Sequence, residues 1–241
     1  VVSRYRLSNT DFGLEAVVGG TDDAVVAEHA AHLSHGDNER IIKEISSKLQ
    51  GPQRNFKHKI INAVKKLNSK KIINDPTDPH LFYLQGDAGA GKSWTIQSII
   101  AELRSMGHIV IPTAFMGCVA NRLPRGETLH HVFKLHIAKE GEDLVNLLFQ
   151  GLLPECDIKE DSDLARVLRA TSLFVIDEIS MVHRAYFWQI NLLLQKLMGN
   201  ELPFGGKLFV VTGDFKQIPP VLEGSSNEEA TMDASILADP I

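Results

Sequence analysis

One stretch of the sequence combines glycines, a lysine and a hydroxyl residue at fixed spacing: Gly86-Asp-Ala-Gly-Ala-Gly-Lys92-Ser93. Glycines let the backbone curl until successive N–H groups point at phosphate oxygens, and a following helix offers its positive N-terminus to the same anion. In that arrangement the Lys92 ammonium reaches the β- and γ-phosphates of a nucleotide, and the Ser93 hydroxyl holds Mg²⁺. The candidate nucleotide-binding residues of this phosphate cradle are Gly86, Asp87, Ala88, Gly89, Ala90, Gly91, Lys92, Ser93 and the adjoining Trp94.

A second stretch, Leu173-Phe-Val-Ile-Asp177-Glu178, is an apolar run that ends in two acids, the first of them 85 residues beyond Lys92. Acids at the end of a strand often belong to an ordinary exposed loop, but a phosphate cradle upstream favours a catalytic pair. Asp177 would hold Mg²⁺, in most such sites through water, and Glu178 would orient and deprotonate the attacking water. Together the two stretches indicate a core that hydrolyses a nucleoside triphosphate.

A parallel sheet is needed to bring these two stretches together, and the apolar pattern predicts one. Helices are predicted over 92–106 and around 186–197, and strands are predicted over 81–84, 108–112, 173–176 and 208–211. Alternation of helices with nearly all-apolar strands is typical of an α/β fold whose parallel sheet is covered by helices on both faces. Ligands of such sheets bind outside the carboxyl ends of the strands, where both motifs fall. We therefore expect a P-loop NTPase fold.

The first 48 residues differ from this core, with eight acids, five bases and weak apolar periodicity. This composition predicts a poorly structured linker or lead-in segment. His29, His32 and His35 lie within it and raise the question of a metal site. No cysteine is near and a three-residue spacing drifts around a helix, so a solvated polar stretch is the favoured interpretation.

Residues 53–71 predict an amphipathic helix with one apolar face and many bases. The apolar face consists of Phe56, Ile60, Ile61, Val64 and Leu67, and the bases are Arg54, Lys57, Lys59, Lys65, Lys66, Lys70 and Lys71. No acid lies between positions 54 and 71. A solvated helix face and a set of phosphate contacts explain this run equally well. Farther along, residues 140–163 hold eight acids and predict a peripheral helical insertion.

The composition sets outer limits on the protein class. The chain has 241 residues, 44% of them hydrophobic, and a net charge of −5, which excludes a generally basic nucleic-acid coat but not a local basic groove. No apolar run approaches the ~18 residues that span a bilayer, so no membrane partner is expected. Cys118 and Cys156 are too few for a disulfide framework and favour a reducing, intracellular compartment. Because the first residue is Val, the chain resembles a piece of a longer protein.

Two longer motifs narrow the class of triphosphatase. Asp177-Glu-Ile-Ser-Met181 and Gly213-Asp-Phe-Lys-Gln217-Ile-Pro-Pro-Val221 closely resemble the petite-integration-frequency helicases, in the RecD-like branch of superfamily one. Leu49-Gln-Gly-Pro-Gln53-Arg54 resembles the glutamine motif with which that family reads adenine, although a helix-capping or exposed glutamine explains Gln53 nearly as well. Pro203-Phe-Gly-Gly-Lys207 is similar both to this family and to the helicase part of Helitron-type mobile elements.

The resemblance also implies a single-stranded DNA path. Thr113–Ala120 and Thr128–His130 are similar to the family's DNA-contacting motifs, and Lys134 follows His130 by one helical turn. The candidate DNA-binding residues are thus Thr113, Phe115, Gly117, Thr128, His130 and Lys134. Phe115 and Met116 stand where the family has Ser or Thr. Phe115 would either stack on a base, which contributes ~1–3 kcal/mol, or join Met116 as a core residue at a helix start, which we slightly favour.

From the resemblance we expect residues 49–241 to form the first RecA-like lobe of an ATP- and Mg²⁺-dependent DNA helicase, with 5′→3′ polarity. Gln217 would lie near the γ-phosphate and report its presence. The family's second RecA-like lobe, which supplies transition-state arginines, is expected after Ile241, and without it turnover should be slow. The alternatives are a nucleotide-dependent DNA-binding module that does not unwind and a helicase segment of a Helitron-type transposon protein. The family implies the nucleus or mitochondrion in a eukaryote and otherwise the cytoplasm.

Overall fold

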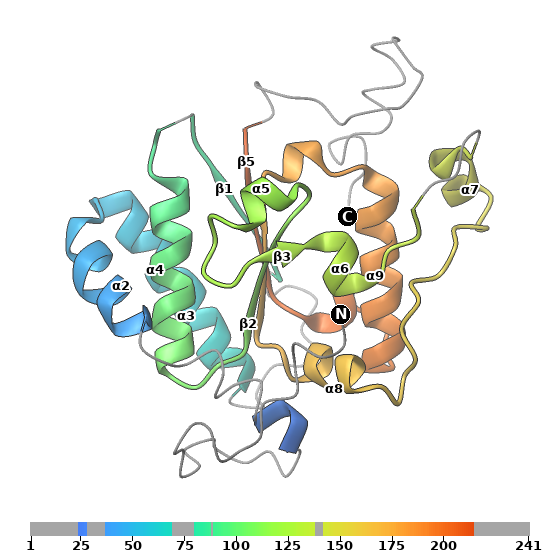
Figure 1. Ribbon diagram of the computed structural model, residues 1–241, viewed down its shortest axis with the longest axis horizontal. Helices are drawn as coiled ribbons and strands as arrows, with labels where there is room; N and C mark the ends of the chain where they lie inside the picture. Colours follow the sequence, from blue (N-terminus) through green and yellow to red (C-terminus); the bar gives the residue numbers. More distant parts are fainter. Residues whose placement is uncertain (1–23, 28–36, 69–79, 88, 138–141, 215–241) are drawn as a thin grey trace.

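A five-stranded parallel sheet organises the protein (Figure 1). The structure is a computed structural model and describes residues 24–27, 37–68, 80–87, 89–137 and 142–214. The strands are β1 Leu81–Gln85, β2 Val110–Ala114, β3 Glu127–Thr128, β4 Leu173–Asp177 and β5 Phe209–Gly213. Their order across the sheet is β1-β5-β4-β2-β3, and every neighbouring pair is parallel. The predicted α/β fold class is therefore confirmed.

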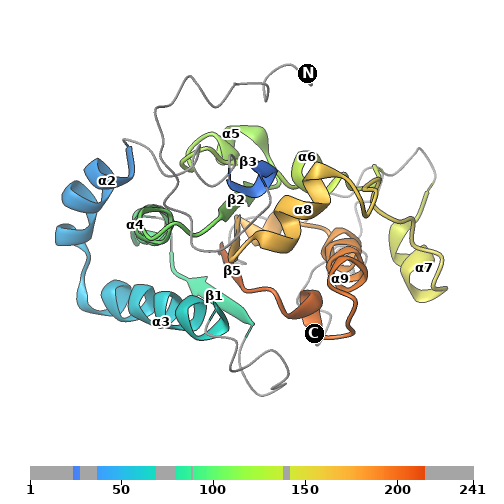
Figure 2. The ribbon, with the colours of Figure 1, turned by 90° about the horizontal axis from the view of Figure 1, so that it is seen from below.

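Helices cover both faces of this sheet (Figures 1 and 2). On one side lie α3 (Gly51–Asn68) and α4 (Lys92–Ser105), with α2 (Asp37–Ile45) and the 3₁₀ turn η3 (Ser46–Lys48) outside α4. On the other side lie α6 (Leu129–Phe133), α8 (Asp163–Ala170) and α9 (Arg184–Met198). The shorter elements are α5 (Gly117–Ala120), α7 (Leu144–Phe149), η4 (Ile179–Met181) and η5 (Pro203–Gly206).

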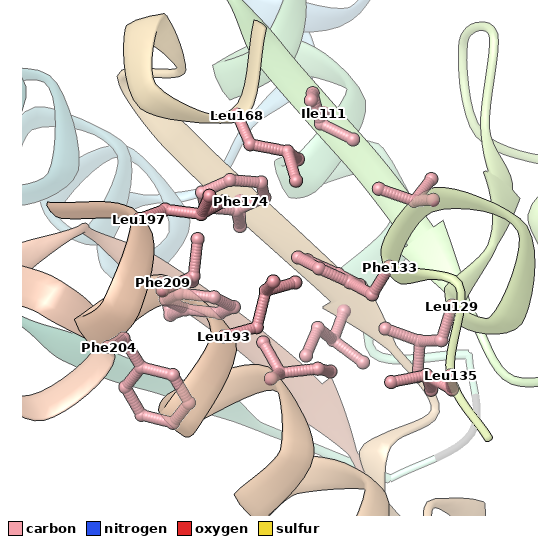
Figure 3. Close-up of a cluster of buried hydrophobic side chains, with 14 of the residues drawn as sticks. Ile111, Leu129, Phe133, Leu135, Leu168, Phe174, Leu193, Leu197, Phe204 and Phe209 are labelled. Atoms are coloured by element: carbon pink, nitrogen blue, oxygen red, sulfur yellow. The ribbon is translucent and has the colours of Figure 1, made fainter. Parts of the chain in front are cut away.

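Each central strand contributes to two separate hydrophobic cores. In β4, Leu173 and Val175 pack toward α3 and α4, whereas Phe174 and Ile176 pack toward α6, α8 and α9. Figure 3 shows the second core, in which the rings of Phe174 and Phe209 stack with centroids 5.0 Å apart. Successive side chains of a strand point to opposite faces, so a strand covered on both faces is apolar at every position. This is why β2, β4 and β5, which are buried at every position, were visible in the sequence.

The strand and helix predictions hold with shifts of one or two residues at most ends. The strand predicted over 108–112 runs instead from Val110 to Ala114, and the helix predicted to end at Met106 ends at Ser105. The edge strand β3 was not predicted, because a strand of two residues is too short to show any periodicity. It pairs in parallel with the end of β2, through Thr113 with Glu127 and Ala114 with Thr128.

The end of the predicted lead-in segment belongs to the folded unit, which corrects the expectation for residues 37–48. These residues form α2 and η3, and the Ser46 hydroxyl lies 2.8 Å from the Ser98 hydroxyl of α4. The Lys57 ammonium of α3 donates to both hydroxyls at 2.9 Å and also forms an ion pair with Glu102. A buried ammonium needs such partners, and they join η3, α3 and α4. His29, His32 and His35 lie outside the described residues.

The basic helix α3 buries the predicted apolar face through Ile60, Ile61 and Val64. Several of its cations serve local packing: besides Lys57, the Lys59 ammonium lies 5.4 Å from the centre of the Phe82 ring. The sequence left a solvated helix face and phosphate contacts equally open for these bases. For Lys57 and Lys59, the contacts within the protein favour a structural role. Lys70 and Lys71 lie outside the described residues.

The predicted acidic insertion is peripheral but mostly not helical. Within its described part, 142–163, α7 is followed by a stretch over 151–162 without helix or strand. Cys118 and Cys156 both carry free thiols. In the described part of the chain, none of the helices combines the length and the apolar character needed to cross a membrane.

Candidate nucleotide site and nucleic-acid interface

The phosphate cradle connects the end of β1 to the start of α4. Gly89 and Gly91 have φ angles of +77° and +80°, in the left-handed region that favours glycine. A Cβ atom at Gly91 would lie 2.5 Å from the Gln53 amide nitrogen, so a larger residue there would displace the Gln53 side chain. The Lys92 ammonium curls back over the loop and donates to the carbonyl oxygens of Gly86 (2.5 Å) and Asp87 (3.1 Å). Ala88 lies outside the described residues.

Gln53 connects the start of α3 to the cradle. Its Oε1 accepts from the Gln50 backbone N–H at 2.8 Å, and its Nε2 donates to the Ala90 carbonyl oxygen at 3.0 Å. The side chain therefore acts as a helix cap, the alternative that the sequence left open, and it also touches the nucleotide loop. An adenine contact by Gln53 stays a prediction.

The acid pair lies at the carboxyl end of β4. Asp177 is 5% exposed, and its Oδ1 accepts from the Thr212 hydroxyl of β5 (3.1 Å) and from the Glu178 N–H (3.0 Å). Oδ2 takes part in neither hydrogen bond. Glu178 is half-buried and has a φ of +53°, an uncommon conformation for a residue with a side chain. Backbone strain of this kind is often found at functional sites.

Burial dominates the electrostatics of these acids. It raises the pKa of Asp177 above 3.8 and that of Glu178 above 4.5, and the neighbouring Asp177 charge raises the pKa of Glu178 further. The positive charges of Lys92 and Arg122 act in the opposite direction and lower the pKa of both carboxyls. The cradle follows β1 and the acid pair ends β4, two parallel strands of one sheet, so both lie at the same edge of the sheet, where the Lys92 charge acts on the acids.

Three predicted DNA-contact residues make contacts within the fold. Thr113 is fully buried, and its hydroxyl donates to the Val175 carbonyl oxygen of β4 at 2.7 Å, so the predicted direct contact by Thr113 is wrong. The Thr128 hydroxyl caps α6 by accepting from the His131 N–H at 3.3 Å. Lys134 ends α6 with a φ of +49°, and its carbonyl oxygen accepts from the Asp157 N–H at 3.1 Å.

Of the remaining contact candidates, Phe115 and His130 form an aromatic cluster with Tyr186, and Gly117 is exposed. The His130 ring lies 5.4 Å from the Phe115 ring and 4.9 Å from the Tyr186 ring, both edge-on. Phe115 is half-buried and packs against the α9-side core, as the core interpretation predicted. That interpretation is wrong for Met116, which is 42% exposed. Burial lowers the pKa of His130, so its imidazole is neutral at pH 7.

A family model described as PIF1-like helicase matches residues 48–239 of the chain. The chain belongs to this family. It is 36% identical over 150 residues to the ATP-dependent DNA helicase Pif1 of Psychrobacter sp. (strain PRwf-1), covering 61% of this chain and 21% of that protein. It is 35% identical over 144 residues to the ATP-dependent DNA helicase RRM3 of Saccharomyces cerevisiae, covering 59% and 18% of the two chains.

The same family appears among solved structures. The crystal structure of the Pif1 helicase from Candida albicans matches with a TM-score of 0.55 and 31% sequence identity, covering 73% of this chain and 34% of that chain. The chain thus spans about a fifth of the length of the two curated PIF1-like relatives and a third of the solved one.

Some of the site residues predicted for a PIF1-like helicase lie near one another in the structure. Lys92, Asp177 and Glu178 share one site, with Gln53 beside the cradle. Ser93 lies in the first turn of α4, and Trp94 is 48% exposed with the Lys48 ammonium 5.6 Å from its ring centre. Gln217 lies outside the described residues.

Sequence reasoning missed three residues of this site. Arg122 acts on both acids from the loop after α5. Burial, and then the charges of Asp214 and Glu178, raise the pKa of Tyr83, whose hydroxyl donates to the Gly213 carbonyl oxygen at 3.2 Å. Asp214 was within a quoted family motif but had been given no role. Arg122 carries no spacing signal, because only the turn of the loop brings it near the end of β4.

Proposed function

We propose that this chain is the first ATP-binding and ATP-hydrolysing lobe of an ATP-dependent DNA helicase that moves along single-stranded DNA. One observation carries the proposal: the cradle and the acid pair meet at one edge of a parallel sheet, where the charge of Lys92 acts on both carboxyls. The PIF1-like relatives named as ATP-dependent DNA helicases support the same function.

The residues present fit ATP and Mg²⁺. The left-handed glycines of the cradle allow close backbone approach, as phosphate binding requires, and Ser93 and Asp177 offer the oxygen ligands that Mg²⁺ prefers. The Thr212 and Glu178 hydrogen bonds hold one oxygen of Asp177 and leave Oδ2 for a cation, directly or through water. When bound, Mg²⁺ would offset the negative charge of the phosphates.

Glu178 supplies the general base of the proposed reaction. Burial and the neighbouring Asp177 charge raise the pKa of Glu178, so this carboxylate accepts a proton from water more readily than an ordinary glutamate. Lys92 places a positive charge opposite the phosphates and so stabilises the charge that develops there. The proposed second lobe would supply arginines to the same phosphates.

The proposed DNA path crosses the surface formed by Phe115, Gly117, Thr128 and His130, with Lys134 at its end. Met116, Gly117 and Cys118 are exposed beside the aromatic cluster, so a strand has access to this surface. A neutral His130 donates a hydrogen bond to phosphate without adding charge. The 5′→3′ polarity rests on the family resemblance alone.

The test uses the longer protein that contains this chain together with a second lobe. We expect ATP hydrolysis that needs Mg²⁺ and rises when an oligo(dT) strand is added. Duplexes with a 5′ or a 3′ single-stranded tail then report the polarity, and we expect unwinding only of the 5′-tailed one. Hydrolysis without any unwinding would favour the DNA-binding module, and absence of ATP binding would refute the proposal.

A further inference from the structure

A surface pocket of about 390 Å³ lies along α4, between α2 and the loop that follows α5. Figures 1 and 2 both show α4 with α2 on one side and α5 on the other. Neither the cradle nor the acid pair lines this pocket. Its charged lining consists of the arginines Arg40, Arg104, Arg122 and Arg125 and the single acid Glu44.

Arg104 forms the buried wall of this arginine pocket. It is 2% exposed, and it donates to the carbonyl oxygens of Pro124 and Val110, each at 2.9 Å. Its Nε is buried and has no hydrogen-bond partner. Burial, helped by the charge of Arg125, lowers the pKa of Arg104 to about 9. Neutral carbonyls leave a buried positive charge uncompensated, which is costly without an anion.

A purely structural role explains only part of this arrangement. The two carbonyl contacts tie α4 to β2 and to the loop, and they would stabilise the fold without any ligand. They leave the buried Arg104 Nε without a partner, and three further arginines line the same pocket with one acid. Guanidinium groups present paired donors that match phosphate oxygens, so a cluster with four arginines and one glutamate suits a phosphate.

We propose that the arginine pocket binds a backbone phosphate of the single-stranded nucleic acid, as a contact additional to the aromatic surface. This inference rests on the proposed function. The loop 121–125, which lines the pocket, directly continues α5, whose first residues Gly117 and Cys118 are exposed on the proposed DNA surface. In a chain of net charge −5, a polyanion binds only where positive charge gathers.

The experiment compares two double variants of the 241-residue chain that remove equal charge. Arg40→Gln with Arg125→Gln alters the pocket mouth and keeps Arg104 and Arg122, whereas Lys65→Gln with Lys66→Gln alters exposed positions of α3. Fluorescence anisotropy of a labelled oligo(dT) over a salt series gives the log–log slope of affinity. We expect the pocket variant to flatten this slope by about 0.7, the value for one phosphate of a single strand, and the α3 variant to keep the parent slope.

A second measurement, on the parent chain, does not depend on whether the pocket variant folds. In the parent chain, the Nε–Hε resonance of Arg104 should shift in nitrogen–proton NMR spectra as oligo(dT) is added. Equal flattening by both double variants, or an unchanged slope together with an unmoved Arg104 resonance, overturns the inference while leaving the proposed function intact.

The source of the phosphate is tested with inorganic phosphate alone. An Arg104 resonance that moves with oligo(dT) but not with millimolar inorganic phosphate supports a nucleic-acid site. A shift with inorganic phosphate and none with oligo(dT) overturns the nucleic-acid assignment. If the parent binds no single-stranded DNA at all, the proposed function of this lobe fails, and this inference fails with it.

Discussion

The phosphate cradle with its acid pair and the contact segment 113–134 lie at the same edge of the sheet but use their residues differently. In the cradle, left-handed glycines and the start of α4 form the binding surface, and Lys92, Asp177 and Glu178 are grouped around it. In the contact segment, the Thr113 hydroxyl bonds within the sheet and the Thr128 hydroxyl caps α6. Backbone chemistry is thus easier to predict than side-chain chemistry, since a hydroxyl or an imidazole can serve either the fold or a ligand.

Replacement of the cradle lysine should have the largest effect. Lys92→Ala removes the positive charge opposite the β- and γ-phosphates, and we expect ATP hydrolysis to fall by about 10²-fold or more. The contacts of Lys92 are with loop carbonyls, so the fold should persist. Titration calorimetry with ATP and Mg²⁺ measures binding, and Lys65→Ala is the matched control. Undiminished ATP affinity would refute the cradle assignment.

Replacement of the proposed base should separate binding from chemistry. Glu178→Gln keeps the shape but cannot accept a proton, so hydrolysis should fall by ~10²–10⁴-fold while ATP affinity stays within a few-fold. Rates are measured in the two-lobed protein, with the exposed Glu201→Gln as control. Hydrolysis near the parent rate would show that another group is the base.

The pH dependence of hydrolysis should report the raised pKa of Glu178. The base acts only when ionised, so kcat/KM, which reports the free enzyme, is lost as the pH falls through this pKa. Because burial and Asp177 raise the pKa, the acid limb of the kcat/KM profile should lie above 4.5, the ordinary value for glutamate. A limb at or below 4.5 would contradict the buried environment of this carboxyl.

The contact segment should respond more weakly than the cradle. His130→Ala removes the central ring of the aromatic cluster, and we expect single-stranded DNA affinity to fall by about 1 kcal/mol, or roughly 5-fold. Because burial keeps His130 neutral, the parent affinity should not change between pH 7 and 8. The neighbouring His131→Ala is the control for fluorescence anisotropy, since His131 pairs with Glu127 instead. Equal losses in both variants would remove His130 from the DNA path.

The smallest effect on DNA binding should come from Thr113. Thr113→Val keeps the side-chain shape but loses the buried hydrogen bond to Val175, so the free energy of unfolding should fall by about 1 kcal/mol. Urea denaturation measures this change, and oligo(dT) affinity should equal that of the parent. Lost affinity with unchanged stability would restore the direct contact predicted from the sequence.

Much of the fold and of the nucleotide site followed from local patterns. The run Leu173–Asp177 is apolar because both of its faces are buried, and its final acid marks the ligand edge of the sheet. The cradle is equally local, since six residues and a helix start define its geometry. The two-residue strand β3 and the helix α2 were missed, because short or polar elements form only when neighbouring elements pack against them.

The sequence by itself determined the strand–cradle–helix unit and the acids at the end of β4, because period-two burial and glycine conformation are properties of adjacent residues. Only the tertiary structure decided which polar side chains remain for ligands. It places the Thr113 hydroxyl in a hydrogen bond within the sheet and the Arg122 charge where it acts on both acids. It also gathers arginines from α2, α4 and the loop after α5 around one pocket. Those outcomes depend on contacts between residues that are distant in the chain, which no local pattern records.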